Sequence, residues 1–392
     1  MTIANKFMIT GPKIYLPNAV LQNSAVLIED GIIQDIVSQE KLKDFLAIEK
    51  FSFSSEFHLV PGFIDMHVHG ASGCDVMDAS VESLMSISAT LASQGTTAFL
   101  ATTMTAARED IENTLFTVSQ FLNSSTKLGA AILGVHLEGP FLSLKKTGAQ
   151  NAKNIIHPDL ALFQEWHRRF PNLIKLVTLA PELSQGLELI SYLKKENIIA
   201  SIGHSNASFD EANNAIAAGC SHATHLFNAM PAIHHREPGA VTAVLLSDEM
   251  TAELIVDGIH LHPAIVRLAL KTKGIDKIIL ITDAMRASCM QDGCYDLGGQ
   301  TVYLKNGRAQ LADGTLAGSV LSMSTAIKNV IDFTKCTLLD VIKMTSENPA
   351  KSLKIFDKKG SIEKKKDADF VLLDNQMDVV ATFVRGRKVY QK

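Results

Sequence analysis

The chain has 392 residues, of which 46% are hydrophobic and 20% are charged, with 24 glycines and 11 prolines. These proportions are close to those of an average globular protein, and they exclude a collagen-like fibre or a low-complexity chain. The 37 basic and 41 acidic residues leave a formal net charge of −4, so no global basic field is available to attract nucleic acid or anionic lipid.

The N-terminal segment has the pattern of a small antiparallel β lobe. Residues 1–60 alternate apolar and polar positions and contain tight-turn signals. The clearest signal is AVLIED-GIIQDIV, where Asp30-Gly31 is a dipeptide that type I′ hairpin turns favour.

Eight short apolar runs follow Pro61, and longer helical segments separate them. Buried parallel strands appear as continuous apolar runs, and eight successive strand-helix repeats are typical of the (β/α)8 barrel. We therefore expect an α/β fold built on a TIM-like barrel. The runs are GFIDMH (62–67), TTAFLAT (96–102), AAILGVH (130–136), LIKLVTL (173–179), IIASIGH (198–204), SHATH (221–225), TAELIV (251–256) and KIILIT (277–282).

The C-terminal part returns to a strand pattern. After a Gly-rich insert from Gly293 to Gly318 and two helical stretches, residues 360–392 alternate again in DADFVLLD and TFVRGRKV. We expect these strands to join the N-terminal lobe. Residues 1–60 and 355–392 would then form one discontinuous β-sandwich domain, and residues 61–354 would form the barrel.

The cysteines and the N-terminus bear on the compartment. Five scattered cysteines without a Cys-x-x-Cys pair argue against a disulfide framework and against a thiolate zinc site. The N-terminal stretch MTIANKFMITGPKIYLP lacks the features of a signal peptide, and no apolar run approaches 18 residues. We expect a cytoplasmic protein that does not associate with a membrane.

Several of the eight runs end in residues that bind metals. In barrels of this kind the active site lies at the C-terminal ends of the strands. Imidazoles and carboxylates without thiolates suit Zn²⁺, or alternatively Fe²⁺, Mn²⁺ or Co²⁺, and we expect one or two ions per subunit. The residues are His67 and His69 (first run), His136 and Glu138 (third), His204 (fifth), His225 (sixth) and Asp283 (eighth).

The sequence spacing of these histidines indicates which of them point into the site. His67 and His69 are two apart, so on a strand they point to the same side and can converge on one ion. His222 and His225 are three apart and should face opposite ways on a regular strand. We assign His225 to the site, because it lies nearer the strand end, and His222 to the structure.

Asp283 follows the apolar run KIILIT, where an ionised carboxylate would be costly unless a metal or its water holds it. The alternative is a helix N-cap. A metal lowers the pKa of water towards neutrality, and a nearby carboxylate can take the water proton and pass it to a leaving group. These residues together predict metal-assisted hydrolysis.

The chain carries the motifs PGFIDMHVHG, HLEGPFLSLKKTGAQ, IGHSNA, HATHLFNAMPAIHHREPG, VDGIH, ITDAM and TLAGS. They resemble the N-acetylglucosamine-6-phosphate deacetylases of the amidohydrolase superfamily, and the resemblance extends over almost the whole chain. It implies metal-dependent deacetylation of N-acetyl-D-glucosamine 6-phosphate to D-glucosamine 6-phosphate and acetate, in amino-sugar catabolism.

The resemblance also implies roles for individual residues. Glu138, His204 and His225 would be the principal metal ligands, and Asp283 the proton acceptor and donor. His67 and His69 match family members that build a second metal position. The residues that match the sugar-binding segments are Ala149, Gln150, Asn228, Ala229, Asp257, His260, Leu316, Ala317 and Gly318.

Arg236 matches an arginine that reaches the 6-phosphate of sugar bound in the neighbouring subunit, so the resemblance implies a homodimer. A guanidinium can grip phosphate oxygens in a bidentate way. The alternative for Arg236 is a surface salt bridge.

Two positions depart from the pattern of relatives. Many have a carboxylated lysine at the end of strand four. TLAPE has no lysine there and Lys175 lies within the run, so Glu138 would replace it. Some have a histidine where this chain has Gln150, which cannot carry a proton.

Three alternative functions compete with this one. Residues 203–207, GHSNA, approach the Gly-x-Ser-x-Gly nucleophile elbow but lack its last glycine. The second alternative is a barrel that has lost its metal and serves as a scaffold. A scaffold has no physical need for buried ionisable groups, which argues against it. The nearest alternative is a sister amidohydrolase that acts on N-acetylgalactosamine 6-phosphate or another N-acylated amino sugar.

Overall fold

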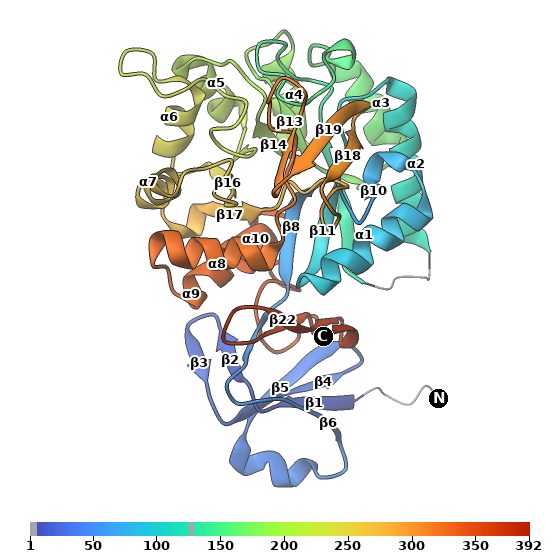
Figure 1. Ribbon diagram of the computed structural model, residues 1–392, viewed down its shortest axis with the longest axis vertical. Coiled ribbons are helices and arrows are strands. Elements are labelled where there is room, and N and C mark those ends of the chain that lie inside the picture. The colour runs from blue at the N-terminus through green and yellow to red at the C-terminus, as the bar shows by residue number, and fades with distance from the viewer. Residues whose placement is uncertain (1–5, 125–128) are drawn as a thin grey trace.

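The computed structural model describes residues 6–124 and 129–392, and the statements below concern these residues. The first five residues of the predicted small domain lie outside them. Figure 1 shows a barrel surrounded by helices above a small β lobe, with α8 (Met323–Thr334), α9 (Leu338–Ile342) and α10 (Asn348–Ser352) on the side of the barrel that faces the lobe.

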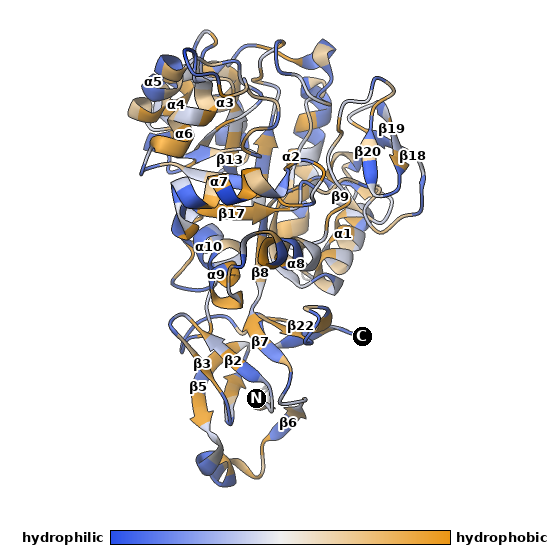
Figure 2. Cartoon of the chain, turned by 60° about the vertical axis from the view of Figure 1, so that its left-hand side comes forward, coloured by the Kyte–Doolittle hydropathy of each residue, from blue (hydrophilic) through white to orange (hydrophobic). Residues whose placement is uncertain are grey.

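All eight predicted runs form strands of one parallel sheet, which confirms the barrel. Their spatial order is β17-β16-β15-β14-β13-β12-β11-β8, the reverse of their order in the chain. In Figure 2 the strands β8, β13 and β17 are coloured mainly hydrophobic, as expected for strands that helices cover. The strands are β8 (Phe63–Val68), β11 (Thr96–Thr102), β12 (Ala131–Glu138), β13 (Ile174–Leu179), β14 (Ile199–Ile202), β15 (His222–Ala223), β16 (Thr251–Ile255) and β17 (Ile278–Ile281).

The barrel closes between β8 and β17 through a buried side chain as well as the backbone. Asp65 Oδ1 accepts from the amides of His67 at 3.2 Å and Thr282 at 3.3 Å, and Asp65 Oδ2 accepts from the Thr282 hydroxyl at 2.5 Å. The amide of Asp283 donates to the His67 carbonyl at 2.9 Å. Burial raises the pKa of Asp65 to about 7. The seam therefore ties the first and the last strand together directly beneath two predicted site residues.

Helices follow most of the strands, and their ends carry the expected caps. Ser208 and Glu211 form a capping box at the start of α5, and Pro263 occupies the first turn of α7. No described helix is long and apolar enough to cross a membrane. The outer helices are α1 (Val81–Ser93), α2 (Arg108–Asn123), α3 (Leu160–Arg169), α4 (Gly186–Lys195), α5 (Phe209–Ala218), α6 (Gly239–Leu246) and α7 (Pro263–Lys273).

The Gly-rich insert forms its own antiparallel sheet from β18 (Gly293–Leu297), β19 (Gln300–Lys305) and β20 (Arg308–Gln310). The side-chain amide of Gln300 donates to the carbonyl of Ala149 at 2.6 Å. This contact fixes the insert against the loop that follows β12.

The small lobe is a sandwich of two sheets, ordered β5-β4-β1-β6 and β23-β22-β21-β7-β2-β3. The C-terminal strands thus pair with the N-terminal lobe, as predicted, because β21 runs antiparallel to β7. The predicted Asp30-Gly31 turn connects β4 and β5, with φ of 50° and 78° as type I′ requires. The strands are β1 (Lys6–Thr10), β2 (Lys13–Leu16), β3 (Ala19–Leu21), β4 (Ser24–Glu29), β5 (Ile32–Ser38), β6 (Glu49–Ser52), β7 (His58–Pro61), β21 (Phe370–Leu373), β22 (Val379–Val384) and β23 (Arg387–Gln391).

A separate apolar core fills this sandwich. Phe7 and Val26 on one sheet belong to the same buried cluster as Leu59, Phe370 and Phe383 on the other. The lobe therefore has an interior distinct from that of the barrel. The exact limits of the two domains, at residues 60/61 and 354/355, stay predictions.

Candidate active site

Glu138, at the end of β12, stands between two pairs of histidines. Its Oε1 lies 3.2 Å from His204 Nε2 and 3.1 Å from His225 Nε2. Its Oε2 lies 3.2 Å from His69 Nε2 and 3.5 Å from His67 Nε2. All five side chains are buried. The structure thus brings together the five residues predicted as ligands, in two groups that share Glu138 and could each hold a metal ion.

Asp283, which follows β17, completes this cluster. Its Oδ1 lies 3.2 Å from His69 Nε2 and 3.3 Å from His67 Nε2. Burial favours the neutral acid, but His67 and His69 outweigh it and hold the pKa of Asp283 below its usual value. An N-cap residue directly precedes a helix, and none of the described helices begins directly after Asp283, so the alternative of a helix N-cap is wrong.

The backbone is unusual at three of these residues. The φ angles are 47° at His204, 29° at His225 and 49° at Asp283, in a left-handed region that residues other than glycine rarely adopt. Each follows a strand end, so the chain turns sharply there while the side chain enters the barrel mouth. Backbone strain of this kind clusters at functional sites.

The hydrogen bonds of His204 and His67 at Nδ1 leave Nε2 of each ring available for a metal ion. His204 Nδ1 lies 2.9 Å from the carbonyl of Lys146, and His67 Nδ1 lies 3.1 Å from the carboxylate of Glu253. Both partners are acceptors, so each Nδ1 carries the proton and the neutral ring has its lone pair on Nε2. These lone pairs face Glu138. Close-set nitrogens and carboxylate oxygens are a donor set that fits a divalent metal ion.

Glu253, in the middle of β16, is a site residue that the sequence analysis missed. It is fully buried, and its carboxylate also lies 3.0 Å from His222 Nε2. Burial favours its neutral form, but His222 and His67 hold the pKa of Glu253 well below its usual range. The available signal was a glutamate within the apolar run TAELIV. His222 lies in this contact rather than at Glu138, in agreement with its predicted structural role.

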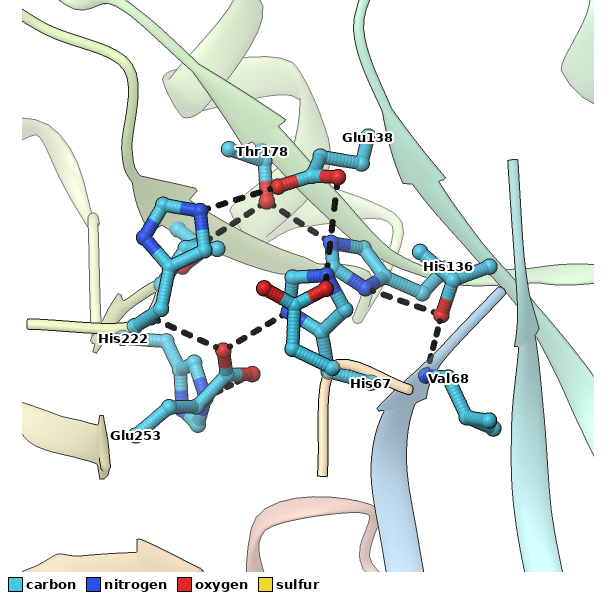
Figure 3. A network of polar contacts seen from close by, with 12 residues as sticks. His67, Val68, His136, Glu138, Thr178, His222 and Glu253 are labelled. Carbon is cyan, nitrogen blue, oxygen red and sulfur yellow. Dashed lines mark hydrogen bonds and ion pairs between the residues drawn. The ribbon is translucent and has the colours of Figure 1, made fainter. Parts of the chain in front are cut away.

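His136 is of a metal-binding type but does not reach the cluster as a ligand. Its Nε2 lies 2.7 Å from the Thr178 hydroxyl, and its ring packs edge-on against His67, with centroids 4.5 Å apart. Burial lowers the pKa of His136 well below its usual value, which favours the neutral ring. Figure 3 shows this network of His136 and Thr178 beside His67, Glu138 and Glu253.

A pocket of about 230 Å³ opens beside the cluster. The structure places seven of the predicted sugar-binding residues on its wall. The wall also includes Met104, Gly148, Leu297 and Thr315, which the sequence analysis did not single out, and Leu297 belongs to the insert. The seven predicted residues are Ala149, Gln150, Asn228, Ala229, His260, Leu316 and Gly318.

Two other predicted sugar-binding residues lie behind this wall. Asp257 Oδ2 lies 2.7 Å from His260 Nδ1, and Asp257 Oδ1 accepts from the amides of Ile259 and His260. Asp257 therefore orients the His260 ring. Ala317 is fully buried between its pocket-lining neighbours and contributes to their packing.

Gln150 contacts Glu138 directly. Its amide nitrogen donates to Glu138 Oε2 at 2.9 Å, and its carbonyl oxygen accepts from the amide of Thr105 at 2.8 Å. These two contacts fix which end of the Gln150 amide is the nitrogen and which is the oxygen. Gln150 can orient Glu138 and donate a neutral hydrogen bond, but it cannot transfer a proton.

Arg236 is not part of this pocket. It lines a separate cavity of about 880 Å³, together with Lys145, Glu182 and Glu237, and its guanidinium contacts His235 Nε2 at 2.7 Å. Within one subunit the structure therefore does not bring Arg236 to the cluster.

The nucleophile-elbow alternative finds no support in the structure. The Ser205 hydroxyl donates to Glu182 Oε2 at 2.7 Å, whereas a serine nucleophile needs a histidine base in contact. His204 points its Nε2 at Glu138 instead.

Comparisons with known proteins agree with this geometry. Residues 58–389 match the model of the amidohydrolase family. The chain is 45% identical over 386 residues to an N-acetylglucosamine-6-phosphate deacetylase from Bacillus subtilis, covering 98% of this chain and 97% of that protein. It is 34% identical over 374 residues to an N-acetylgalactosamine-6-phosphate deacetylase from Escherichia coli O157:H7, covering 94% and 98%.

A similar solved structure carries a ligand. It is an N-acetyl-D-glucosamine-6-phosphate deacetylase mutant from Mycobacterium smegmatis in complex with N-acetyl-D-glucosamine-6-phosphate. The TM-score is 0.92 at 28% identity, with 99% of this chain and 100% of that chain covered.

Proposed function

The chain belongs to the amidohydrolase family, and on that basis we propose that it removes the acetyl group from N-acetyl-D-glucosamine 6-phosphate, which yields D-glucosamine 6-phosphate and acetate. The observation that carries the proposal is the cluster of Glu138, four histidines and Asp283 at the mouth of a barrel, beside a pocket that can admit a small substrate. The identity of the substrate comes from the relatives that are named for this reaction.

A divalent metal, Zn²⁺ in the first place and Fe²⁺, Mn²⁺ or Co²⁺ as alternatives, would be held by Glu138, His204 and His225. His67 and His69 would hold a second ion with Glu138. The metal supplies Lewis acidity, which activates water and polarises the amide carbonyl.

The protein's own groups supply proton transfer and orientation. Asp283, as a carboxylate, accepts a proton from the attacking water and then delivers it to the departing amine nitrogen, which would otherwise be a very poor leaving group. His260, oriented by Asp257, and the wall residues Asn228 and Ala229 position the sugar. Gln150 donates to Glu138, and we assign it a positioning role.

We further propose a homodimer in which Arg236 reaches the phosphate of sugar bound in the partner subunit. Arg236 lies outside its own subunit's pocket, which is compatible with this role. We also propose a cytoplasmic location, which the five free cysteines favour.

The experiment that tests the proposal combines metal analysis of the purified protein with acetate release from a panel of N-acetylated sugars and their 6-phosphates. We expect bound metal and the highest kcat/KM with N-acetyl-D-glucosamine 6-phosphate. Preference for the galactosamine epimer would favour the sister function, since one relative carries that name. Bound metal is equally required by both functions, so its absence together with no acetate release would indicate a scaffold.

A further inference from the structure

We propose that Glu253 is a positioning residue, which holds His67 and the backbone at His225 in the orientation that the metal-binding cluster requires, and that His222 holds Glu253 in turn. Of the proposed function, this inference assumes only that the cluster around Glu138 binds metal. The identity of the sugar does not enter it.

Glu253 connects three barrel strands from the middle of one of them. Its Oε2 lies 3.1 Å from Nδ1 of His67, a residue of β8, and accepts from the amide of His225, beyond the end of β15, at 3.1 Å. Its Oε1 lies 3.0 Å from His222 Nε2 on β15. The carboxylate is fully buried, and both of its oxygens are engaged (Figure 3).

The contact with His67 decides which ring nitrogen faces the cluster. A carboxylate can only accept a hydrogen bond, so His67 Nδ1 must carry the proton. The lone pair of the neutral ring then lies on Nε2, which faces Glu138 and Asp283 at 3.5 Å and 3.3 Å. A carboxylate behind a metal-binding imidazole fixes its tautomer and its orientation and raises its basicity.

The contact with His225 stabilises an unfavourable backbone conformation at that residue. His225 has a φ of 29°, which lies outside the backbone regions that residues with a Cβ atom favour. The Glu253 side chain accepts from the His225 amide, and the Glu253 carbonyl accepts from the amide of Leu226 at 2.9 Å. One residue of β16 therefore anchors two consecutive amides at the point where the chain turns.

Glu253 acts through these neighbours rather than on the substrate. It is not on the wall of the pocket, and its oxygens contact His67 Nδ1 and not the nitrogen that faces the cluster. A change at Glu253 should therefore alter metal binding and kcat while leaving KM nearly unchanged.

The conservative variant Glu253→Gln separates this role from one in folding. The glutamine oxygen can keep the contacts with His67 and His225, while its amide donates to His222. The His222 ring can switch its proton to accept that bond, because its Nδ1 has no hydrogen-bond partner among the described residues. The fold should persist, but His67 would lose its charged partner.

Co²⁺ is the probe, because its visible absorption reports coordination geometry without any substrate. For Glu253→Gln we expect roughly 10- to 100-fold weaker Co²⁺ binding in the metal-depleted protein, an altered Co²⁺ spectrum and a comparable loss in kcat. Ser201→Ala is the matched control, because the buried Ser201 hydroxyl forms its side-chain hydrogen bond, among the described residues, with Thr224 and none with Glu253. We expect the control to match the parent.

Two variants of His222 test the outer contact. His222→Gln retains a donor towards Glu253 and should keep Co²⁺ affinity close to the parent's, whereas His222→Ala removes it and should shift affinity in the same direction as Glu253→Gln.

Parent-like Co²⁺ affinity, spectrum and kcat in Glu253→Gln would overturn the proposal. Failure of the parent to release acetate from any sugar would instead refute the proposed function, and the Co²⁺ measurements would still decide the role of Glu253.

Discussion

Replacing Asp283 with Asn should leave a folded, metal-binding protein that has lost most of its turnover. Asparagine has nearly the same shape, and its carbonyl oxygen can occupy the place of Oδ1, which lies 3.2 Å from His69 Nε2. It cannot accept a proton from water or return one to the amine. Both proton transfers are therefore removed while the wall of the pocket stays in place.

The size of the effect follows from that loss. General acid–base catalysis by a positioned side chain contributes roughly 10²- to 10⁴-fold, which corresponds to about 2.7–5.4 kcal/mol of activation free energy. We expect kcat to fall within this range. KM should change little, because the remaining pocket residues keep their contacts.

The assay measures metal content and acetate release on the same preparation. Among the described contacts, the group of Glu138, His204 and His225 does not involve Asp283, so metal bound there should remain. Asp276→Asn, a change at an exposed carboxylate that pairs with Lys343, is the control for loss of one negative charge. A loss confined to KM, or an unchanged kcat, would refute the role assigned to Asp283.

The other predictions concern the proposed metal ligands and Arg236. His204→Ala should abolish turnover and remove the metal held with Glu138, and full activity in a metal-free variant would contradict this. His67→Ala combined with His69→Ala should lower the metal content at saturation from two ions to one, as elemental analysis can show; an unchanged content of one ion would rule out the second position. Arg236→Ala should cost on the order of 2–4 kcal/mol of binding, chiefly as a raised KM for phosphorylated sugar, and an equal loss with unphosphorylated sugar would reject the assignment.

Local patterns were sufficient for the barrel strands and for most of the cluster. A strand covered by helices is apolar at nearly every position, so runs such as TTAFLAT and KIILIT mark β11 and β17 without further information. Parallel strands present their C-terminal ends on one side of the barrel. His69, Glu138 and Asp283 could therefore be assigned to one site although they are far apart in the chain.

Side-chain direction and cross-barrel contacts required the tertiary structure. His136 is two residues before Glu138 on the same strand, yet it binds Thr178, because only the last residues of β12 reach the mouth. Glu253 lies in the middle of its strand rather than at the end, so a search of strand ends passes over it. Its role depends on His67, 186 positions earlier in the chain, being brought within 3.1 Å.

The sequence by itself thus determined the barrel, the β lobe and the residue types at the barrel mouth, because strand burial and strand ends are local properties of the chain. The tertiary structure decided which nitrogen of each ring faces the cluster, which residues line the pocket and that Arg236 stands apart from it. The physical reason is that barrel closure, through contacts such as that of Asp65 with Thr282, sets the distances between side chains that no local pattern relates.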